Sequence, residues 1–249
     1  MSAAYIEGSV ILWEGPSELD GAPLVVIATG LATDSANRKT GEMVQTYILR
    51  ADVSPVLAVQ TGADSSICGD CRHRGATGPR TCYVNLGQGP LTVWTAYRAG
   101  RYRRATPAQV AEAGRGRLVR LGTYGDPAAA PAILWGRLVA WAVGHTGYTH
   151  QWRTSAGLRG LLMASVETLA EHAEAVAAGW RTFRVAMLGE ARQTGERPCP
   201  AAKESGARVT CSACLLCHGT GEGKRSGVMI QPHGNSAVMA GVRFLRAAH

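Results

Sequence analysis

Apolar and β-branched residues come in short runs in the first quarter of the chain, and polar turn sequences separate these runs. The turn sequences include GPSELDG and GLATDSANRKTGE, which are rich in Gly, Ser, Asp and Asn. Short apolar runs bounded in this way predict strands. The strands expected here cover residues 9–13, 24–29, 44–49 and 55–60. We therefore expect a β-rich segment at the start of the chain.

Helical and strand-like patterns alternate farther along. Residues 106–114 predict a short helix, because Thr106 can cap it, Pro107 suits its first position and Gly114 can end it. Apolar residues also recur at helical spacing in PAILWGRLVAWAVG and TLAEHAEAVAAG. The strand-like runs are LTVW (91–94), RLVRLGTY, GYTHQW, LRGLLMASVE, WRTFRVAML and GVMIQPHG. This alternation favours an α/β fold built from parallel βαβ units.

Polar loops follow the expected strands. Active sites of parallel α/β folds lie where the strands have their carboxyl ends, so these loops are expected to share one rim. The residues expected on that rim are Cys68, Asp126, His150, Glu167 and His233. The pattern divides the chain into a β-rich segment (1–54), a β/α core (55–198) and a cysteine-rich region that also contributes the last strand (199–249).

Charge and hydropathy constrain the partner and the compartment. The 249 residues carry a net charge of +8, and arginines crowd the stretch 98–120 beside Tyr97 and Tyr102. Arginine and aromatic side chains suit phosphate contact and base stacking, so this stretch predicts a nucleic acid or nucleotide partner. A solvated basic surface is the alternative. The opening sequence has no basic leader, and the longest apolar stretch, 131–143, is too short to span a bilayer. We expect a cytoplasmic protein with no membrane partner.

The cysteines fall into two groups. In a reducing compartment such spacing indicates metal ligands rather than disulfides. The first group is Cys68, Cys71 and Cys82, in the sequence CGDCRHRGATGPRTC. Three thiolates leave one coordination position open, so an iron–sulfur cluster with an exchangeable position is one interpretation. Zinc bound by these cysteines and His73 is the second interpretation. Three buried cysteines without a metal are the third.

The second group has enough thiols to close a metal site. It consists of Cys199, Cys211, Cys214 and Cys217. The CxxCxxC spacing holds three thiolates on a short piece of backbone, which is common where cysteines surround an iron–sulfur cube. Pro198 and Pro200 make the backbone beside the first of these cysteines rigid. A structural zinc site on the same four cysteines, with His218 as a spare ligand, is the alternative.

These features resemble the radical S-adenosylmethionine (SAM) enzymes. The resemblance rests on three cysteines after a strand, Gly125-Asp126-Pro127 after the next strand, and Ser165 and Glu167 at a later strand end. The family's usual cysteine spacing is CxxxCxxC, which differs from the spacing here. The resemblance implies a partial (β/α) barrel, with one [4Fe–4S] cluster and SAM at the first cysteine group and a second cluster at the C-terminal group.

The resemblance also implies roles for individual residues. Gly125, Asp126 and Pro127 would contact the SAM amino group, and Ser165 and Glu167 its ribose and carboxylate. An external electron donor would reduce the first cluster, and the resulting deoxyadenosyl radical would take a hydrogen atom from the substrate. The segments RLGTYGDP and HTGYTHQW also resemble uncharacterised bacteriophage proteins.

The expected function is therefore an iron–sulfur enzyme that modifies a nucleic acid or nucleotide. His150 and Glu167 are its candidate catalytic residues, as acid, base or ligand. A hydrogen-bonded structural histidine and a helix cap are the alternatives for these two. The alternative function is a zinc protein with two structural sites that binds nucleic acid. A zinc hydrolase is a third hypothesis, although no HxE motif precedes the first cysteines.

Overall fold

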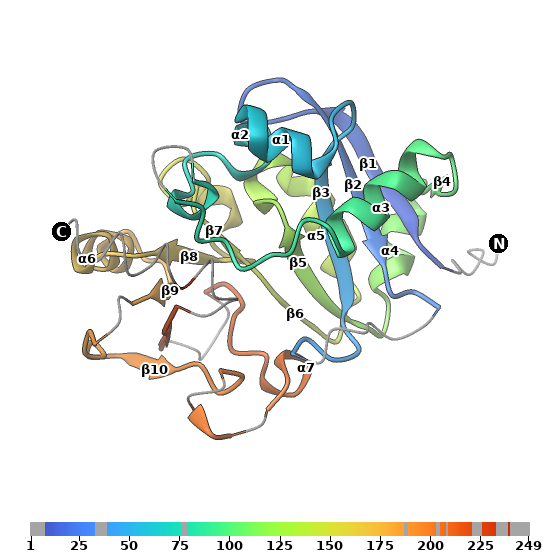
Figure 1. Cartoon of the computed structure of the whole chain (residues 1–249). Helices are drawn as coiled ribbons and strands as arrows, with labels where there is room; N and C mark the ends of the chain where they lie inside the picture. Colours follow the sequence, from blue (N-terminus) through green and yellow to red (C-terminus); the bar gives the residue numbers. More distant parts are fainter. Residues whose placement is uncertain are drawn as a thin grey trace.

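The computed structural model describes residues 8–32, 39–75, 79–186, 189–202, 205–207, 209–220, 226–232 and 239. Within these ranges the fold is α/β, with one mixed and one parallel sheet (Figure 1). The sequence prediction of an α/β fold is therefore confirmed at this level. The expected rim residue His233 lies outside the described residues.

The first sheet has the strand order β4-β1-β2-β3-β5-β6. Its strands are β1 (Val10–Pro16), β2 (Pro23–Thr29), β3 (Val44–Arg50), β4 (Arg103–Arg104), β5 (Leu118–Tyr124) and β6 (Gly144–Thr146). The neighbours β1, β2 and β3 are antiparallel, whereas β3 pairs with β5 and β5 with β6 in parallel. The pairing therefore continues from the N-terminal strands into the following β/α part without a break.

The second sheet has the strand order β10-β11-β9-β8-β7. Its strands are β7 (Tyr148–Thr149), β8 (Met163–Val166), β9 (Thr182–Val185), β10 (Glu196–Pro198) and β11 (Gly227–Ile230). Each of these neighbouring pairs is parallel. Parallel strands thus extend from β3 in the first sheet to β10 in the second.

Gly147 connects the two sheets, because it lies between β6 and β7. A Cβ atom at this position would lie 2.6 Å from Leu162 Cδ2 and 3.0 Å from Leu121 Cβ. Any side chain would force these core residues apart, so the crossing point requires glycine. The chain can therefore leave one sheet and enter the next within a single residue.

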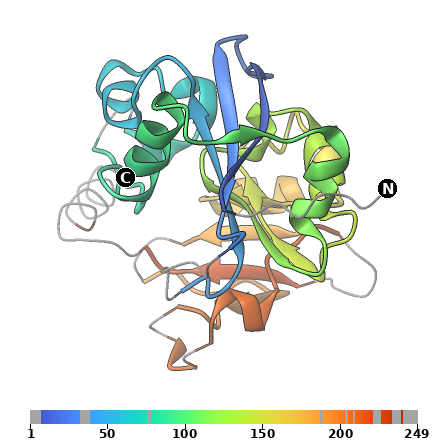
Figure 2. The same cartoon turned by 90° about the vertical axis from the view of Figure 1, so that its right-hand side faces the viewer.

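Helices cover the first sheet on both sides, α1 to α3 on one and α4 with α5 on the other (Figure 2). These five helices are α1 (Pro55–Thr61), α2 (Ser65–Cys68), α3 (Gly89–Arg98), α4 (Pro107–Gly114) and α5 (Ala132–Val139). The helix α6 (Leu169–Ala177) packs on β8 and β9 of the second sheet, and α7 (Cys211–Cys214) lies in the second cysteine group. Three 3₁₀ turns are η1 (Arg72–Arg74), η2 (Pro127–Ala129) and η3 (Ala156–Leu158). None of the helices in the described ranges has the length and apolarity to cross a membrane.

The helix expected at 106–114 is confirmed, but two expected strands are wrong. Residues 55–60 belong to α1, where the Ser54 side chain accepts a hydrogen bond from the Leu57 amide and Gly62 ends the helix at a φ of +78°. Residues 91–94 belong to α3, which has Pro90 in its first turn. In both segments a proline at the helix start outweighs the strand preference of the apolar residues that follow.

The main core fills the space between the first sheet and its helices. Val26, Ile48, Trp135 and Leu138 have no exposed surface there. Trp135 Nε1 donates to the carbonyl of Pro127 at 2.7 Å, so the buried indole has its hydrogen bond and ties α5 to η2. A smaller cluster lies along the second sheet and consists of Met163, Phe183, Cys199, Val228 and Ile230.

A buried ion pair joins β9 to β10. Arg184 Nε and Nη2 donate to the two carboxylate oxygens of Glu196 at 2.7 and 2.9 Å, and both side chains are fully enclosed. Burial alone would raise the pKa of Glu196, but the hydrogen bonds from Arg184 lower it overall. The folded state therefore favours the ionised carboxylate.

Replacing Glu196 with Gln should lower the free energy of unfolding by about 2 kcal/mol, because Arg184 loses the charge of the carboxylate that accepts two of its hydrogen bonds and keeps the ion pair with Glu190. The loss should be present above the unfolded carboxyl pKa of about 4.3 and should shrink as the pH falls through the lower folded value. Denaturant titrations of both proteins at pH 7 and pH 3 would measure this.

The control is Glu174→Gln, which breaks the exposed pair between Glu174 and Arg153. This variant should unfold like the parent protein, because exposed pairs contribute little. Equal stability of the Glu196→Gln variant and the parent at pH 7 would contradict the assignment.

Candidate functional site

One cavity of about 940 Å³ brings the two cysteine groups together. Its lining includes every cysteine of the chain, namely Cys68, Cys71, Cys82, Cys199, Cys211, Cys214 and Cys217. All of them are free thiols. Two groups separated by more than a hundred residues of sequence therefore face a common space.

Backbone hydrogen bonds shape the first cysteine group. The Cys71 amide donates to the Cys68 carbonyl at 3.2 Å, and Gly69 between them has a φ of +57°. The Cys82 amide donates to the His73 carbonyl at 2.9 Å, which returns the chain to the CxxC turn. Cys82 thus lies with the other two despite the long loop between them.

Buried and partly buried side chains hold this loop against the sheets. Arg74 donates to Asp64 Oδ1 at 2.7 Å and to the Gly69 carbonyl at 3.1 Å. Gln151, just after β7, donates to Asp70 Oδ1 at 2.7 Å. Because these bonds reach the CxxC turn from two directions, the positions of its thiols are fixed by the fold.

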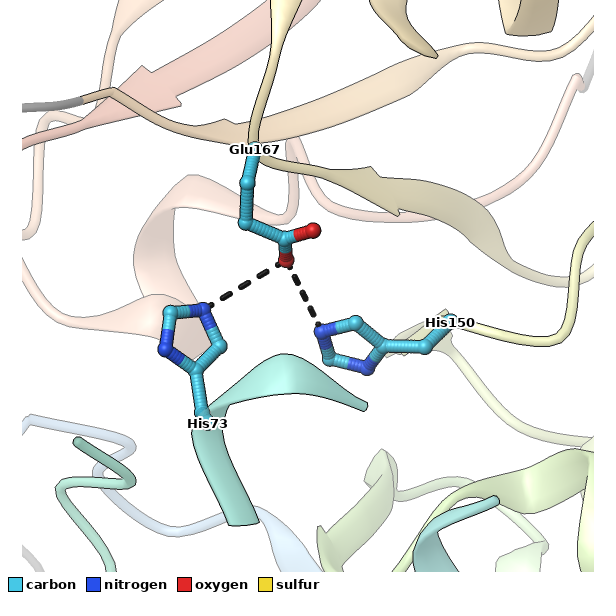
Figure 3. Close-up of side chains that lie close together, drawn as sticks. All are labelled: His73, His150 and Glu167. Atoms are coloured by element: carbon cyan, nitrogen blue, oxygen red, sulfur yellow. Dashed lines mark hydrogen bonds and ion pairs between the residues drawn. The ribbon is translucent and has the colours of Figure 1, made fainter. Parts of the chain in front are cut away.

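His73, His150 and Glu167 meet beside the first cysteine group (Figure 3). One Glu167 oxygen lies 3.1 Å from His150 Nε2 and 3.4 Å from His73 Nε2. His150 Nε2 also lies 3.5 Å from Cys71 Sγ. His73 Nδ1 lies 2.9 Å from Thr81 Oγ1. The two predicted catalytic residues are therefore neighbours, and His73 joins them.

Electrostatics favours charge separation within this group. Burial opposes ionisation of Glu167, but hydrogen bonds from His150 and His73 bring its pKa below the usual range. Burial likewise opposes protonation of His150, but negative charge on Cys71 and Glu167 raises its pKa well above the usual range. The arrangement can hold a proton on an imidazole next to a carboxylate and a thiol.

The position of Glu167 follows from the start of α6. Thr168 caps this helix by accepting from the Glu171 amide at 3.1 Å, and Glu171 Oε2 accepts from the amides of Thr168 and Glu167. This capping box fixes the backbone at the end of β8. Glu171 also pairs with Arg72 at 3.0 Å, which ties α6 to the turn that carries His73.

Asp126 joins three parts of the rim. Its amide donates to the Ile67 carbonyl at 2.6 Å, beside Cys68. Its carboxylate accepts from the amides of His150 at 2.7 Å and Ala128 at 2.9 Å. Burial raises its pKa. Both carboxylate oxygens are thus engaged by backbone, which makes Asp126 a structural residue in the described geometry.

Two of the other residues expected to bind SAM lie on the cavity surface. Gly125 and Ser165 line the cavity, whereas Pro127 is buried and is not part of the cavity lining. Gly125 has a φ of +82°, and a Cβ atom there would lie 2.7 Å from Ile48 Cβ. Only glycine allows β5 to turn this close to β3.

The second cysteine group is attached to both sheets. The Cys199 amide donates to the Met229 carbonyl of β11 at 2.8 Å, and the Gly147 amide donates to the Cys217 carbonyl at 2.7 Å. The Thr210 side chain caps α7, which carries Cys211 and Cys214. Two backbone hydrogen bonds and the cap of α7 therefore position the four cysteines at the cavity.

Arg181 fixes the last part of this segment. Its guanidinium donates to the carbonyls of Leu216, His218, Gly219 and Ser226, and its side chain is almost fully buried. Gly219 lies so close to the Gly160 backbone that a Cβ atom would meet its carbonyl carbon at 2.3 Å. One planar cation thus satisfies carbonyls that the loop leaves without strand or helix partners.

Burial raises the thiol pKa in both groups, in Cys68 and Cys82 as well as in Cys199 and Cys217.

The described residues include every cysteine. Among them, no set of three metal-ligand atoms that contains a cysteine sulfur has all its atoms within 4.8 Å of one another. The one trio within that distance among the described residues consists of His73, His150 and Glu167. Every trio with a cysteine sulfur therefore has at least one pair of atoms more than 4.8 Å apart, whereas the sulfurs around one zinc ion lie about 3.8 Å apart on Zn–S bonds of about 2.3 Å.

Sequence reasoning missed the role of Tyr124. It is the last residue of β5 and only 4% exposed, it lines the cavity, and its hydroxyl has no hydrogen-bond partner in the described part of the chain. Burial raises its pKa, and negative charge on Cys68 adds to the effect. A hydroxyl in the cavity wall without a protein partner can donate to a water or a ligand in the cavity. The signal in the sequence was its place directly before Gly125.

The basic stretch 98–120 does not form one continuous charged surface. Arg104 pairs with Glu14, Arg115 pairs with Glu112, and Arg117 donates to the carbonyls of Gly30 and Leu31. Arg98 donates to the Ala51 carbonyl and lies over the Trp94 ring. Arg120 instead lines the cavity. The arginines that are neighbours in sequence thus have separate tasks in the fold.

No protein-family model matches the chain, and neither the curated proteins nor the solved structures include a significant match to it. The function is therefore argued from the site's own geometry and chemistry.

Replacing Arg181 with Lys should loosen the segment of the second cysteine group, because one ammonium cannot satisfy the carbonyls that the guanidinium binds. The amides of Gly219 and Thr220 bond to the carbonyls of Leu161 and Arg159. Their hydrogen exchange should become at least about tenfold faster, since each lost bond to a charged group is worth about 1.5 kcal/mol or more. The exposed Arg197→Lys is the control, and unchanged exchange in Arg181→Lys would contradict the clamp.

Proposed function

We propose that this protein is an iron–sulfur enzyme that resembles radical SAM proteins. The observation that carries the proposal is the common cavity lined by a three-cysteine group and a four-cysteine group. Three thiols can hold a cluster with one open position, and four can hold a complete one. An enzyme of this kind needs a space beside its open centre for a small molecule, and the cavity supplies such a space beside the first cysteine group.

The arrangement of the strands supports the proposal. Parallel pairing runs from β3 through β5, and β6 continues into β7 and the second sheet. Asp126 follows β5, His150 follows β7 and Glu167 follows β8, whereas Cys68 ends α2, because α1 and α2 lie between β3 and the first cysteines. We propose that these strands form the partial (β/α) barrel that the sequence resemblance implies. Their carboxyl ends then surround the reaction site, as in other parallel α/β enzymes.

The donor set of both groups consists of thiols, which can hold iron–sulfur clusters. Thiolates are soft ligands, which suit both zinc and iron–sulfur clusters. Each cysteine of a cluster binds a different iron atom, so cluster ligands stand farther apart than the ligands of one ion, and the absence of a compact trio of cysteine sulfurs among the described residues is compatible with a cluster. The hydroxyl of Tyr124 adds a donor without a partner at the edge of the first group. Hydrogen bonds to cluster sulfur are among the features that set a reduction potential.

Within this proposal Cys68, Cys71 and Cys82 hold the first [4Fe–4S] cluster, which when reduced supplies the electron that cleaves bound SAM. Gly125 and Ser165 present backbone and hydroxyl groups to the cofactor from the cavity wall. Asp126 acts indirectly, by fixing the turn that contains Gly125. His150 and Glu167 hold a proton beside the first cysteine group.

The remaining parts of the proposal concern the second centre and the partners. Cys199, Cys211, Cys214 and Cys217 hold a second cluster, which binds substrate or accepts an electron. An external donor reduces the first cluster, and free thiols of this kind suit the reducing cytoplasm. The net charge of +8 supports a nucleic acid or nucleotide as substrate.

The test is SAM cleavage by protein reconstituted with iron and sulfide without oxygen. Addition of dithionite and SAM should release 5′-deoxyadenosine. Cys71→Ala should reduce the release at least about a hundredfold, because the first cluster loses a ligand. Cys214→Ala is the matched control from the second group and should keep measurable cleavage.

Two outcomes would contradict the proposal. Brown protein that releases no 5′-deoxyadenosine would be an iron–sulfur protein without SAM chemistry. Colourless protein that binds zinc at both groups would instead support the nucleic-acid-binding alternative. Circular dichroism of each variant should match the parent, which separates a lost ligand from a lost fold.

A further inference from the structure

Arg120 lies between the two cysteine groups. It lies in β5, paired in register with Thr146 of β6. Tyr148 begins β7 two residues after Thr146. The Gly147 amide, in the same crossing, donates to the Cys217 carbonyl at 2.7 Å. On the other side Tyr83, which follows Cys82 in the sequence, bonds to the Arg120 side chain.

Two tyrosine hydroxyls hold one nitrogen of the guanidinium. Arg120 Nη2 donates to Tyr83 Oη and to Tyr148 Oη, each at 3.1 Å, and the two hydroxyls lie 2.8 Å apart. The Tyr148 ring stacks on Phe183 with centroids 4.6 Å apart. The aromatic support and the hydroxyl pair fix the orientation of the guanidinium plane.

The other donors of Arg120 are available to a ligand. Within the part of the chain that the structure describes, Arg120 Nε and Nη1 make no hydrogen bond. The guanidinium also makes no ion pair with these residues. This differs from Arg74 and Arg184, which each bind a carboxylate. Arg120 lines the cavity, so its unused N–H groups belong to the cavity wall.

Arg120 also stays charged in this enclosed position. Burial works against its charge, but interactions with Tyr148 and Tyr83, and with Cys211 and Cys217, raise its pKa overall. A fixed guanidinium with free N–H groups in a cavity wall is a typical receptor for a planar or tetrahedral anion.

We propose that Arg120 is an anion-binding residue that anchors a carboxylate or phosphate group of the substrate between the two cysteine groups. The identification of the anion as substrate rests on the proposed function. The anion site itself is built from protein groups alone. An anchor at this place would hold the remainder of the substrate inside the cavity, within reach of both centres.

The experiment measures binding of inorganic phosphate and of succinate to the full-length protein by calorimetry. The two probes distinguish the phosphate and carboxylate forms of the ligand. Arg120→Gln should weaken binding of the preferred probe at least about tenfold, because charge-assisted hydrogen bonds are lost. Arg120→Lys should be intermediate, since an ammonium keeps the charge without the planar donors. Arg153→Gln, outside the cavity, should bind like the parent.

Binding of neither probe, or equal binding by the parent and Arg120→Gln, would overturn the proposal. So would a loss of affinity as large in Arg153→Gln as in Arg120→Gln, since that would reflect net charge only. The result is separable from the proposed function. Protein without iron that binds phosphate through Arg120 contradicts the SAM chemistry alone. Iron-loaded protein that cleaves SAM but binds both probes independently of Arg120 contradicts the anion site alone.

Discussion

The hydrogen bonds of Asp126 are the constraint on which the rest of the site depends. The buried Asp126 carboxylate accepts hydrogen bonds from the amides of His150 and Ala128. Its own amide donates a hydrogen bond to the carbonyl of Ile67, the residue before Cys68. These bonds set the ends of β5 and β7 and the first cysteine loop relative to one another. Burial raises the pKa of the Asp126 carboxyl, and the two backbone N–H groups oppose this effect by donating hydrogen bonds to the carboxylate. The hydrogen bonds of Asp126 therefore position the first cysteine loop relative to the ends of these strands.

Long-range contacts explain why two distant cysteine groups share one cavity. Gly147 lets the chain pass between sheets, and its amide bonds to the carbonyl of Cys217. Arg181 then organises the carbonyls around that cysteine. The same crossing carries Tyr148, which supports Arg120. Cys217, Arg120 and Tyr148 therefore line the same cavity, because the C-terminal segment packs on the junction between the two sheets.

The sequence predicted much of the fold where the signals are local. Thr106 and Pro107 correctly placed the start of α4, and the alternation of strands and helices indicated the α/β class. Residues 55–60 were wrongly expected to be a strand, because their apolar side chains obscured the cap at Ser54. Apolar runs this short suit either element, and the surrounding caps decide between them.

The candidate site was harder to predict from the sequence than the fold was. The grouping of the cysteines was visible in their spacing, but the meeting of His73 with Glu167 depends on contacts across many residues. The enclosed hydroxyl of Tyr124 is a property of burial, which spacing does not encode. Arg120 belongs to a run of arginines, and its place in the cavity wall distinguishes it from Arg104 and Arg115, which pair with carboxylates.

The central claim is that the two cysteine groups are two iron–sulfur centres. Counting iron, acid-labile sulfide and zinc in protein purified without oxygen, together with its Mössbauer spectrum, tests this claim most directly. Two [4Fe–4S] clusters predict about eight iron atoms and about eight sulfides per chain, with little zinc. About two zinc ions per chain with no sulfide would contradict the account.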